Sequence, residues 1–166
     1  MRKKRILFCS EATFLNTGYA TYTREILNYL HGTGKDEIAE LGAYGQRNDP
    51  RANNIPWKYY GVAPNTDFEP KATQEELQVY NQSGTNQFGE WIFEHVCLDF
   101  MPDVVCDIRD FWMLEFAERS PFRKFFNLKK VFIIFSIFFD RTYITMCLSI
   151  IRINGECFVI SLYRIL

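Results

Sequence analysis

An apolar run, a glycine-bearing loop and an amphipathic segment follow one another between residues 5 and 30. The run spans residues 5–10, the loop residues 11–18, and the segment 19–30 repeats apolar side chains at spacings of three and four. A strand that leads into a helix through such a loop is typical of α/β domains that hold phosphorylated ligands, because the first helical amides and the positive dipole end face the loop. Gly18 has no Cβ, so it permits a positive φ and a close approach of ligand to backbone. The pattern predicts a ligand site at the carboxyl end of the first strand.

The composition is that of one folded domain. Of the 166 residues, 48% are apolar and 17% aromatic, which is enough to bury a core. The formal net charge of −1 gives no support for binding nucleic acid through phosphate attraction. The basic residues 2–5 precede an apolar stretch of only four residues, too short for the core of a signal peptide. We therefore expect a cytoplasmic protein that binds no nucleic acid.

Cysteine and histidine are too scattered to predict a metal or redox site. No two of the five cysteines form a CxxC pair, and Cys9 and Cys106 fall in predicted buried strands. The two histidines, His31 and His95, lie far apart, and His95 sits in an apolar helix, where we expect a structural role. We interpret the thiols as core residues and expect no metal.

Strands and helices alternate along the first three quarters of the chain. The predicted strands after the first are residues 37–41, 57–62 and 104–108, and the predicted helices after the first are 73–80, 88–101 and 111–119. A loop at 42–56 and a linker at 81–87 separate them, and Thr73 with Glu76 resembles a capping box. Such alternation predicts an α/β fold with a Rossmann-like parallel sheet flanked by helices. In the commonest doubly wound order the fourth strand lies beside the first, which brings the Gly18 loop to residues 107–110.

The composition changes after about residue 126, and we divide the chain there into a Rossmann-like domain (1–126) and an irregular apolar tail (127–166). Residues 131–139 supply nine apolar positions before Asp140 and Arg141, whereas a membrane span needs roughly 20. Phe, Ile, Leu, Tyr and Lys are also what AT-rich codons encode when read out of frame or through an intron. The tail is then either foreign to the domain or, as the lesser alternative, a segment that binds a membrane or a partner.

Three segments together resemble the N-terminal domain of family 4 glycosyltransferases, which have the GT-B architecture of two Rossmann-like domains. They are the loop and helix at residues 16–27, the run Phe-Gly-Glu-Trp at 88–91, and the Pro-Asp-Val-Val-Cys-Asp-Ile-Arg-Asp run at 102–110. The resemblance covers about residues 4–125. It implies transfer of a sugar from a nucleotide-sugar donor to a sugar or other hydroxyl acceptor.

The chain also departs from that family. The loop has one glycine where many relatives have two, and the fourth strand ends in Asp-Ile-Arg-Asp where the family often has a histidine. The second domain, which binds most of the nucleotide-sugar and has two glutamates eight positions apart, is missing from this sequence. The resemblance therefore implies the acceptor-side half of a truncated enzyme, inactive as this isolated chain. P-loop and GxGxxG patterns are absent too, so we expect no cofactor other than the donor substrate.

The loop after the fourth strand contributes three candidate site residues. Asp110 is the catalytic candidate, because it would orient an acceptor hydroxyl or accept its proton; its alternative role is to cap the helix near residue 111. Arg109 either binds an anionic group or pairs with a carboxylate such as Asp107. Trp112 either stacks on a sugar ring or packs in the core.

The loop before the first helix contributes the other candidates. Gly18 either approaches a donor phosphate or acceptor, or merely forms the turn into the helix. Thr17 and Thr21 either hydrogen-bond the substrate or cap the helix. Tyr19 belongs to the same motif and is predicted to bind substrate. Glu11 follows the first strand and either points into the same crevice or lies in a surface loop.

Two alternative functions remain open. One is a stand-alone flavodoxin-like or receiver-like binding module, although a receiver needs an acidic cluster after its first strand, where Glu11 stands alone, and an Asp at the end of its third. The other is a non-catalytic protein that assembles through its apolar tail.

Overall fold

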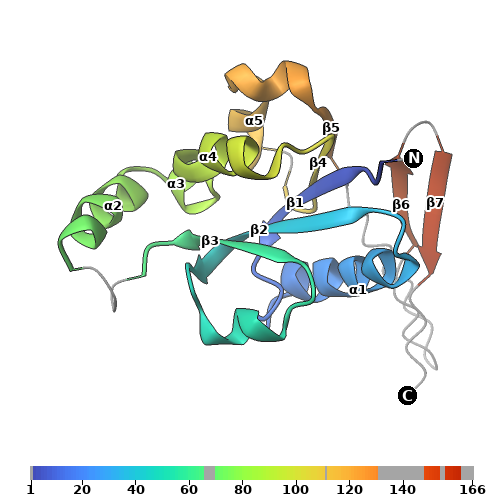
Figure 1. The fold of residues 1–166 in the computed structure, drawn as a ribbon, viewed down its shortest axis with the longest axis horizontal. Helices are drawn as coiled ribbons and strands as arrows, with labels where there is room; N and C mark the ends of the chain where they lie inside the picture. The colour runs from blue at the N-terminus through green and yellow to red at the C-terminus, as the bar shows by residue number, and fades with distance from the viewer. Residues whose placement is uncertain (1, 66–69, 111, 131–147, 154–155, 162–166) are drawn as a thin grey trace, which may run out of the picture.

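The computed structural model of the chain describes residues 2–65, 70–110, 112–130, 148–153 and 156–161 (Figure 1). Five parallel strands form one sheet, in the order β3-β2-β1-β4-β5. The strands are β1 Arg5–Glu11, β2 Glu37–Gln46, β3 Lys58–Ala63, β4 Val104–Asp107 and β5 Asn127–Lys130. The α-helices are α1 Gly18–Thr33, α2 Pro70–Gln82, α3 Gly84–Gln87, α4 Glu90–Phe100 and α5 Glu115–Arg119, with 3-10 helices η1 Pro50–Asn54 and η2 Pro121–Phe125.

This strand order is that of the Rossmann fold, and it confirms the predicted α/β class. β1 lies at the centre, with β2 on one side and β4 on the other, so the first and fourth strands are neighbours as predicted. Cys9 of β1 is opposite Asp107 of β4, and Glu11 is opposite Ala43 of β2. Flavodoxin-like sheets have the order 2-1-3-4-5 instead. Because the strands are parallel, the segments that follow β1, β2 and β4 leave the same edge of the sheet.

Both faces of the sheet are covered by helices, with α1 on one side and α4 and α5 on the other (Figure 1). Alternate residues of β1 point to opposite faces: Ile6 and Phe8 pack toward α1, whereas Leu7 and Cys9 pack toward α4. A strand buried on both faces needs a continuous apolar run rather than an alternating one, which is why residues 6–9 are apolar throughout.

The first helix matches its prediction closely. Thr17 caps its start, since the Thr17 hydroxyl oxygen accepts a hydrogen bond from Ala20 N at 3.2 Å. Gly34 ends it in the left-handed conformation, with φ of 63°.

Other element boundaries differ from prediction. β2 continues to Gln46 through part of the predicted loop 42–56. α2 begins at Pro70, so Thr73 lies inside the helix and the predicted capping box is wrong; proline is well suited to a first helical position. The predicted linker contains the short α3, capped by Ser83. α4 begins only at Glu90, because Gly89 has φ of 115°. The helix predicted at 111–119 is helical only over Glu115–Arg119, and residue 111 lies outside the described residues.

The strand β5 extends the sheet past the domain boundary predicted at residue 126. Further on, β6 Leu148–Ile153 and β7 Glu156–Ser161 pair antiparallel in a separate two-stranded sheet. The remaining tail predictions, including the apolar run at 131–139, fall outside the described residues. Among the residues that are described, no helix combines the length and the apolar character needed to cross a membrane.

A bulge in β2 is the main irregularity of the sheet. The pairing of β2 with β3 shifts between Gly42 and Gln46, and Tyr44 within this stretch has a φ of 61°. On β3, Gly61 lies against the bulge, so close that a Cβ at this position would overlap the backbone of Gln46 and Arg47. The absence of a side chain at Gly61 therefore lets the bulge form.

We expect Gly61→Ala to destabilise the domain by about 1–3 kcal/mol, because the added methyl group meets backbone atoms that cannot rotate away. Gly84→Ala is the matched control: a Cβ there meets nothing within 4 Å. The control should leave stability unchanged or raise it by up to about 1 kcal/mol, as alanine favours helix. Urea denaturation followed by circular dichroism measures both, and equal effects would contradict this account of the bulge.

Candidate functional site

Two loops from distant parts of the sequence meet at the carboxyl edge of the sheet. The hydroxyl of Tyr19, in the first turn of α1, donates a hydrogen bond to Asp110 Oδ1 at 3.0 Å. Below this contact, Ile108 N donates to Cys9 O at 3.3 Å and so continues the β1–β4 pairing. The predicted meeting of the Gly18 loop with residues 107–110 is therefore confirmed. Partial burial, followed by the hydrogen bond to Asp110, raises the pKa of Tyr19.

Arg109 lies beneath this contact and is buried, with 1% of its side chain exposed. Its Nε donates to Asp107 Oδ1 at 2.9 Å and its Nη1 to Phe88 O at 3.3 Å. The guanidinium carbon also stands 5.7 Å from the centre of the Phe88 ring. Of the two predicted roles, pairing with Asp107 is thus present in the structure. Nη2 is buried and has no hydrogen-bond partner among the described residues.

Glu11 ends β1 at the same edge of the sheet and is half-buried. Its Oε2 is enclosed and has no hydrogen-bond partner among the described residues, which is unusual for a buried carboxyl oxygen. The negative charge of Glu11 helps to raise the pKa of two neighbouring phenols. For Tyr44 it is the second cause after burial, and for Tyr19 it is a smaller contribution. Glu11 therefore belongs to one polar cluster with these two tyrosines.

The remaining candidates of the first loop have local roles in the structure. Thr17 is the cap of α1, as one of its alternatives proposed. Gly18 opens the helix without using the positive φ that a glycine permits; the positive-φ glycines of the described chain are Gly34 and Gly89. A Cβ on Gly18 would meet nothing within 4 Å, so the backbone there is open to solvent. Thr21 is exposed on the first turns of α1.

An aromatic row runs along the rim of the crevice and includes two residues that the sequence did not single out as binding residues. Tyr44 lies edge-on to Phe88 at a centroid distance of 6.2 Å, and Phe88 lies edge-on to Trp112 at 5.3 Å. Phe88 is buried, whereas Tyr44 and Trp112 are each 44% exposed. Trp112 is therefore packed on one side and open on the other. The signal for Tyr44 was the run Gly-Ala-Tyr-Gly at 42–45, in which small residues surround one large ring.

A buried carboxylate, Glu40 of β2, holds the loop between β1 and α1 from behind. Its Oε1 accepts from Thr13 N at 2.7 Å, and its Oε2 accepts from the Thr13 hydroxyl at 2.8 Å and from Trp57 Nε1 at 2.8 Å. Arg24 Nη1 donates to Thr13 O at 2.7 Å from the α1 side. These bonds define the path of the loop. The sequence analysis missed Glu40 because a lone acidic residue in a weak strand has no distinguishing pattern.

The buried thiols are not candidates for chemistry. Cys9, Cys97 and Cys106 are buried. Burial raises the pKa of the Cys9 thiol and that of Cys97, the latter to about 12. Such thiols are poor nucleophiles at neutral pH, which agrees with the predicted core role of Cys9 and Cys106. Within the described residues, no group of three or more His, Cys, Asp or Glu side chains has the arrangement of a metal site. His95, expected to be structural, is exposed on α4.

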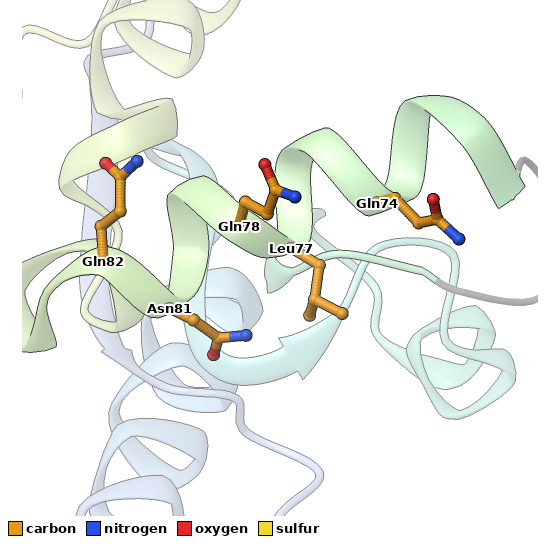
Figure 2. A pocket seen from close by; sticks show the side chains of 5 residues that line it. All are labelled: Gln74, Leu77, Gln78, Asn81 and Gln82. Carbon is orange, nitrogen blue, oxygen red and sulfur yellow. The ribbon is translucent and has the colours of Figure 1, made fainter.

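Two hollows lie outside the carboxyl-edge cluster. One is bordered by a single helix, α2, and its side chains are shown in Figure 2: Gln74, Leu77, Gln78, Asn81 and Gln82. These side chains leave the helix in different directions and do not converge on a common point (Figure 2). The other is bordered by Arg5, at the start of β1, and by Asp103, just before β4, and so lies at the opposite end of the sheet. The charged residues at the second hollow, Arg2, Arg5 and Asp103, hydrogen-bond to one another or to the backbone.

The comparisons with known proteins find nothing similar: no family model, no curated protein and no solved structure matches this chain.

We expect Glu40→Gln to lower stability by about 1–3 kcal/mol at acidic pH, because its amide nitrogen cannot accept the bonds that the lost oxygen accepted. Burial raises the pKa of Glu40 from its ordinary value of 4.5, so the folded state holds this proton more tightly than the unfolded state. The stability contributed by Glu40 is thus largest below pH 4.5 and is lost as the pH rises through the raised pKa.

The difference in unfolding free energy between wild type and Glu40→Gln should therefore shrink as the pH rises. Urea denaturation of both proteins between about pH 4 and about pH 8 measures it. Glu25→Gln, a change at an exposed position of α1, is the control and should alter stability by less than about 0.5 kcal/mol. A difference that widens with pH would contradict the assignment.

We expect Asp107→Asn to cost about 3–5 kcal/mol, because it leaves the buried Arg109 guanidinium without its counter-charge. Glu90→Gln breaks a second Arg–carboxylate pair, with Arg119 at 3.4 Å, which is largely open to solvent. This control should change stability by less than about 0.5 kcal/mol. Thermal or urea unfolding compares the two variants, and a small effect of Asp107→Asn would show that Arg109 is stabilised by other groups.

Proposed function

We propose that this chain is the acceptor-side domain of a glycosyltransferase, which moves a sugar from a nucleotide-sugar donor to a hydroxyl acceptor. The observation that supports this most is the hydrogen bond between Tyr19 and Asp110, because it joins the two motif-bearing loops at one edge of a Rossmann-ordered sheet. Ligands of open α/β sheets bind outside the carboxyl ends of the strands, where the strand order reverses. In this sheet that reversal lies between β1 and β4.

In this proposal, Asp110 orients the attacking hydroxyl of the acceptor and accepts its proton. Asp110 is exposed, and its Oδ1 accepts a hydrogen bond from the Tyr19 hydroxyl. This bond fixes the orientation of the carboxylate, and Oδ2 is the oxygen that accepts the proton. Trp112 stacks on the acceptor, and Glu11 binds one of its hydroxyls. The start of α1, with its open Gly18 backbone, faces the diphosphate on which charge builds as the donor bond breaks.

The donor needs a second wall that we propose lies outside this chain. In this proposal the carboxyl edge of the sheet, at the ends of β1, β2 and β4, forms one side of the donor pocket. A nucleotide-sugar bound to one side only would keep most of its surface in water, and binding sites for small molecules normally bury most of the ligand. The isolated chain is therefore inactive in transfer, and its donor is a substrate rather than a resident cofactor.

A non-catalytic interaction module is a second candidate function, and one surface feature favours it. At the opposite end of the sheet from the crevice, three large apolar side chains are more than half exposed: Leu98 (63%), Met101 (64%) and Phe125 (67%). They border the same hollow as Phe122 and Phe126. Apolar groups gathered in this way are typical of surfaces that contact another protein.

Calorimetric titration of the full chain with uridine diphosphate glucose and with guanosine diphosphate mannose tests the donor side of the proposal. We expect dissociation constants well above about 1 μM, because a one-sided site cannot supply the roughly 8 kcal/mol that micromolar binding needs. Micromolar binding of either compound would contradict an acceptor-side role, since the donor pocket would then be complete.

Gly18→Ala refines this titration. A Cβ at Gly18 meets no protein atom within 4 Å, so the substitution should leave the fold intact. Any loss of weak donor binding would then come from a clash between the new methyl group and the ligand. Gly84→Ala also adds a methyl group in open space at the first residue of a helix, and should leave donor binding unchanged.

A further inference from the structure

The carboxyl-edge crevice has more negative than positive side chains. Among the described residues, this edge of the sheet holds the carboxyl groups of Glu11, Asp110 and the buried Asp107, together with the buried guanidinium of Arg109. Arg109 is already paired with Asp107 at 2.9 Å, so its charge is balanced inside the protein. Glu11 and Asp110 remain without a cationic partner among the ion pairs of the described residues. An anionic group on an acceptor that lies against Glu11 and Asp110 therefore meets two uncompensated carboxylates.

The nearest arginines outside the cluster are engaged elsewhere. Arg24 donates to the backbone oxygen of Thr13 at 2.7 Å, behind the loop. Arg47, just after β2, pairs with Glu76 of α2 at 2.6 Å and stands 5.8 Å from the Trp91 ring. Neither contact directs a free positive charge toward Glu11 or Asp110. The charge of the crevice thus disfavours phosphate or carboxylate on the acceptor.

The rim of the same crevice offers apolar ring faces. Tyr44 and Trp112 are each 44% exposed, and both pack edge-on against the buried Phe88 between them. The left-handed backbone at Tyr44, with φ of 61°, is a costly conformation for a tyrosine, and the β2 bulge imposes it. This backbone conformation holds the partly exposed ring of Tyr44 at the rim instead of burying the ring in the sheet.

We propose that this crevice selects a neutral sugar ring as its acceptor, with the C–H face of the ring against Tyr44 and Trp112 and its hydroxyl groups donating to Glu11 and Asp110. This inference rests on the proposed transferase function and specifies its acceptor class. A hydroxyl group donates a hydrogen bond to a carboxylate without bringing a second negative charge.

Saturation-transfer nuclear magnetic resonance with the full chain tests this choice. The probes are the methyl glycosides of glucose, galactose and mannose, each compared with the uronic acid glycoside that has a carboxylate in place of its primary alcohol. We expect at least one neutral glycoside to bind, and its uronic acid counterpart to bind at least about tenfold more weakly, because of the two carboxylates. Equal or tighter binding of the uronic acid forms would overturn the inference, as would binding by none of the six.

Variants locate the binding on the crevice. Trp112→Ala and Tyr44→Ala should each weaken binding of the neutral glycoside about three- to tenfold, through loss of a ring face. Tyr29→Ala removes a tyrosine that is 66% exposed on α1, away from the crevice, and should have no effect. An equal loss in Tyr29→Ala and Tyr44→Ala would count against the site.

Glu11→Gln provides a test that does not depend on the aromatic rim. It keeps the size of the side chain and removes one negative charge, so the tenfold preference for the neutral glycoside should fall by about threefold or more. An unchanged preference would overturn the role given to Glu11. This set of outcomes also separates the two proposals. Preference for uronic acids with weak nucleotide-sugar binding refutes only the neutral acceptor. Micromolar nucleotide-sugar binding refutes the acceptor-side role, and with it the acceptor assignment that rests on it.

Discussion

The ion pair between Asp107 and Arg109 is the interaction on which the arrangement of the carboxyl edge depends. Both side chains are almost fully enclosed, and Arg109 reaches from the end of β4 to the backbone oxygen of Phe88, just before α4. A charge in such a place is tolerated only when it is paired and hydrogen-bonded. The pair therefore ties the end of β4, next to the exposed Asp110, to the turn that precedes α4.

A second buried polar group, Glu40, fixes the loop on the other side of the crevice. Glu40 binds two groups of Thr13 and the indole of Trp57, so the loop after β1 is tied to β2. With both loops anchored from within the core, the hydrogen bond between Tyr19 and Asp110 joins two positions that are already held. The crevice is thus built by buried polar contacts, and its exposed groups are free to meet a ligand.

The sequence predicted the elements of this site better than its surroundings. The apolar run of β1, the cap at Thr17 and the order of strands and helices follow from local patterns, and so does the meeting of the Gly18 loop with Asp110. Tyr44 was not predicted to bind, because its position depends on a bulge that forms only when β2 pairs with β3 beside Gly61. Glu40 was missed since its donors belong to Thr13 and Trp57, which lie in two other segments of the chain.

The amino-acid sequence by itself determined the fold class, because alternating apolar runs and amphipathic segments can bury their surfaces only as a parallel sheet between helices. It also determined which loops leave the same edge of that sheet. Tertiary structure alone decided whether Arg109 is free or paired, which tyrosines face the crevice, and where the surplus negative charge lies. Those properties depend on distances between side chains from different segments, and no local pattern encodes such distances.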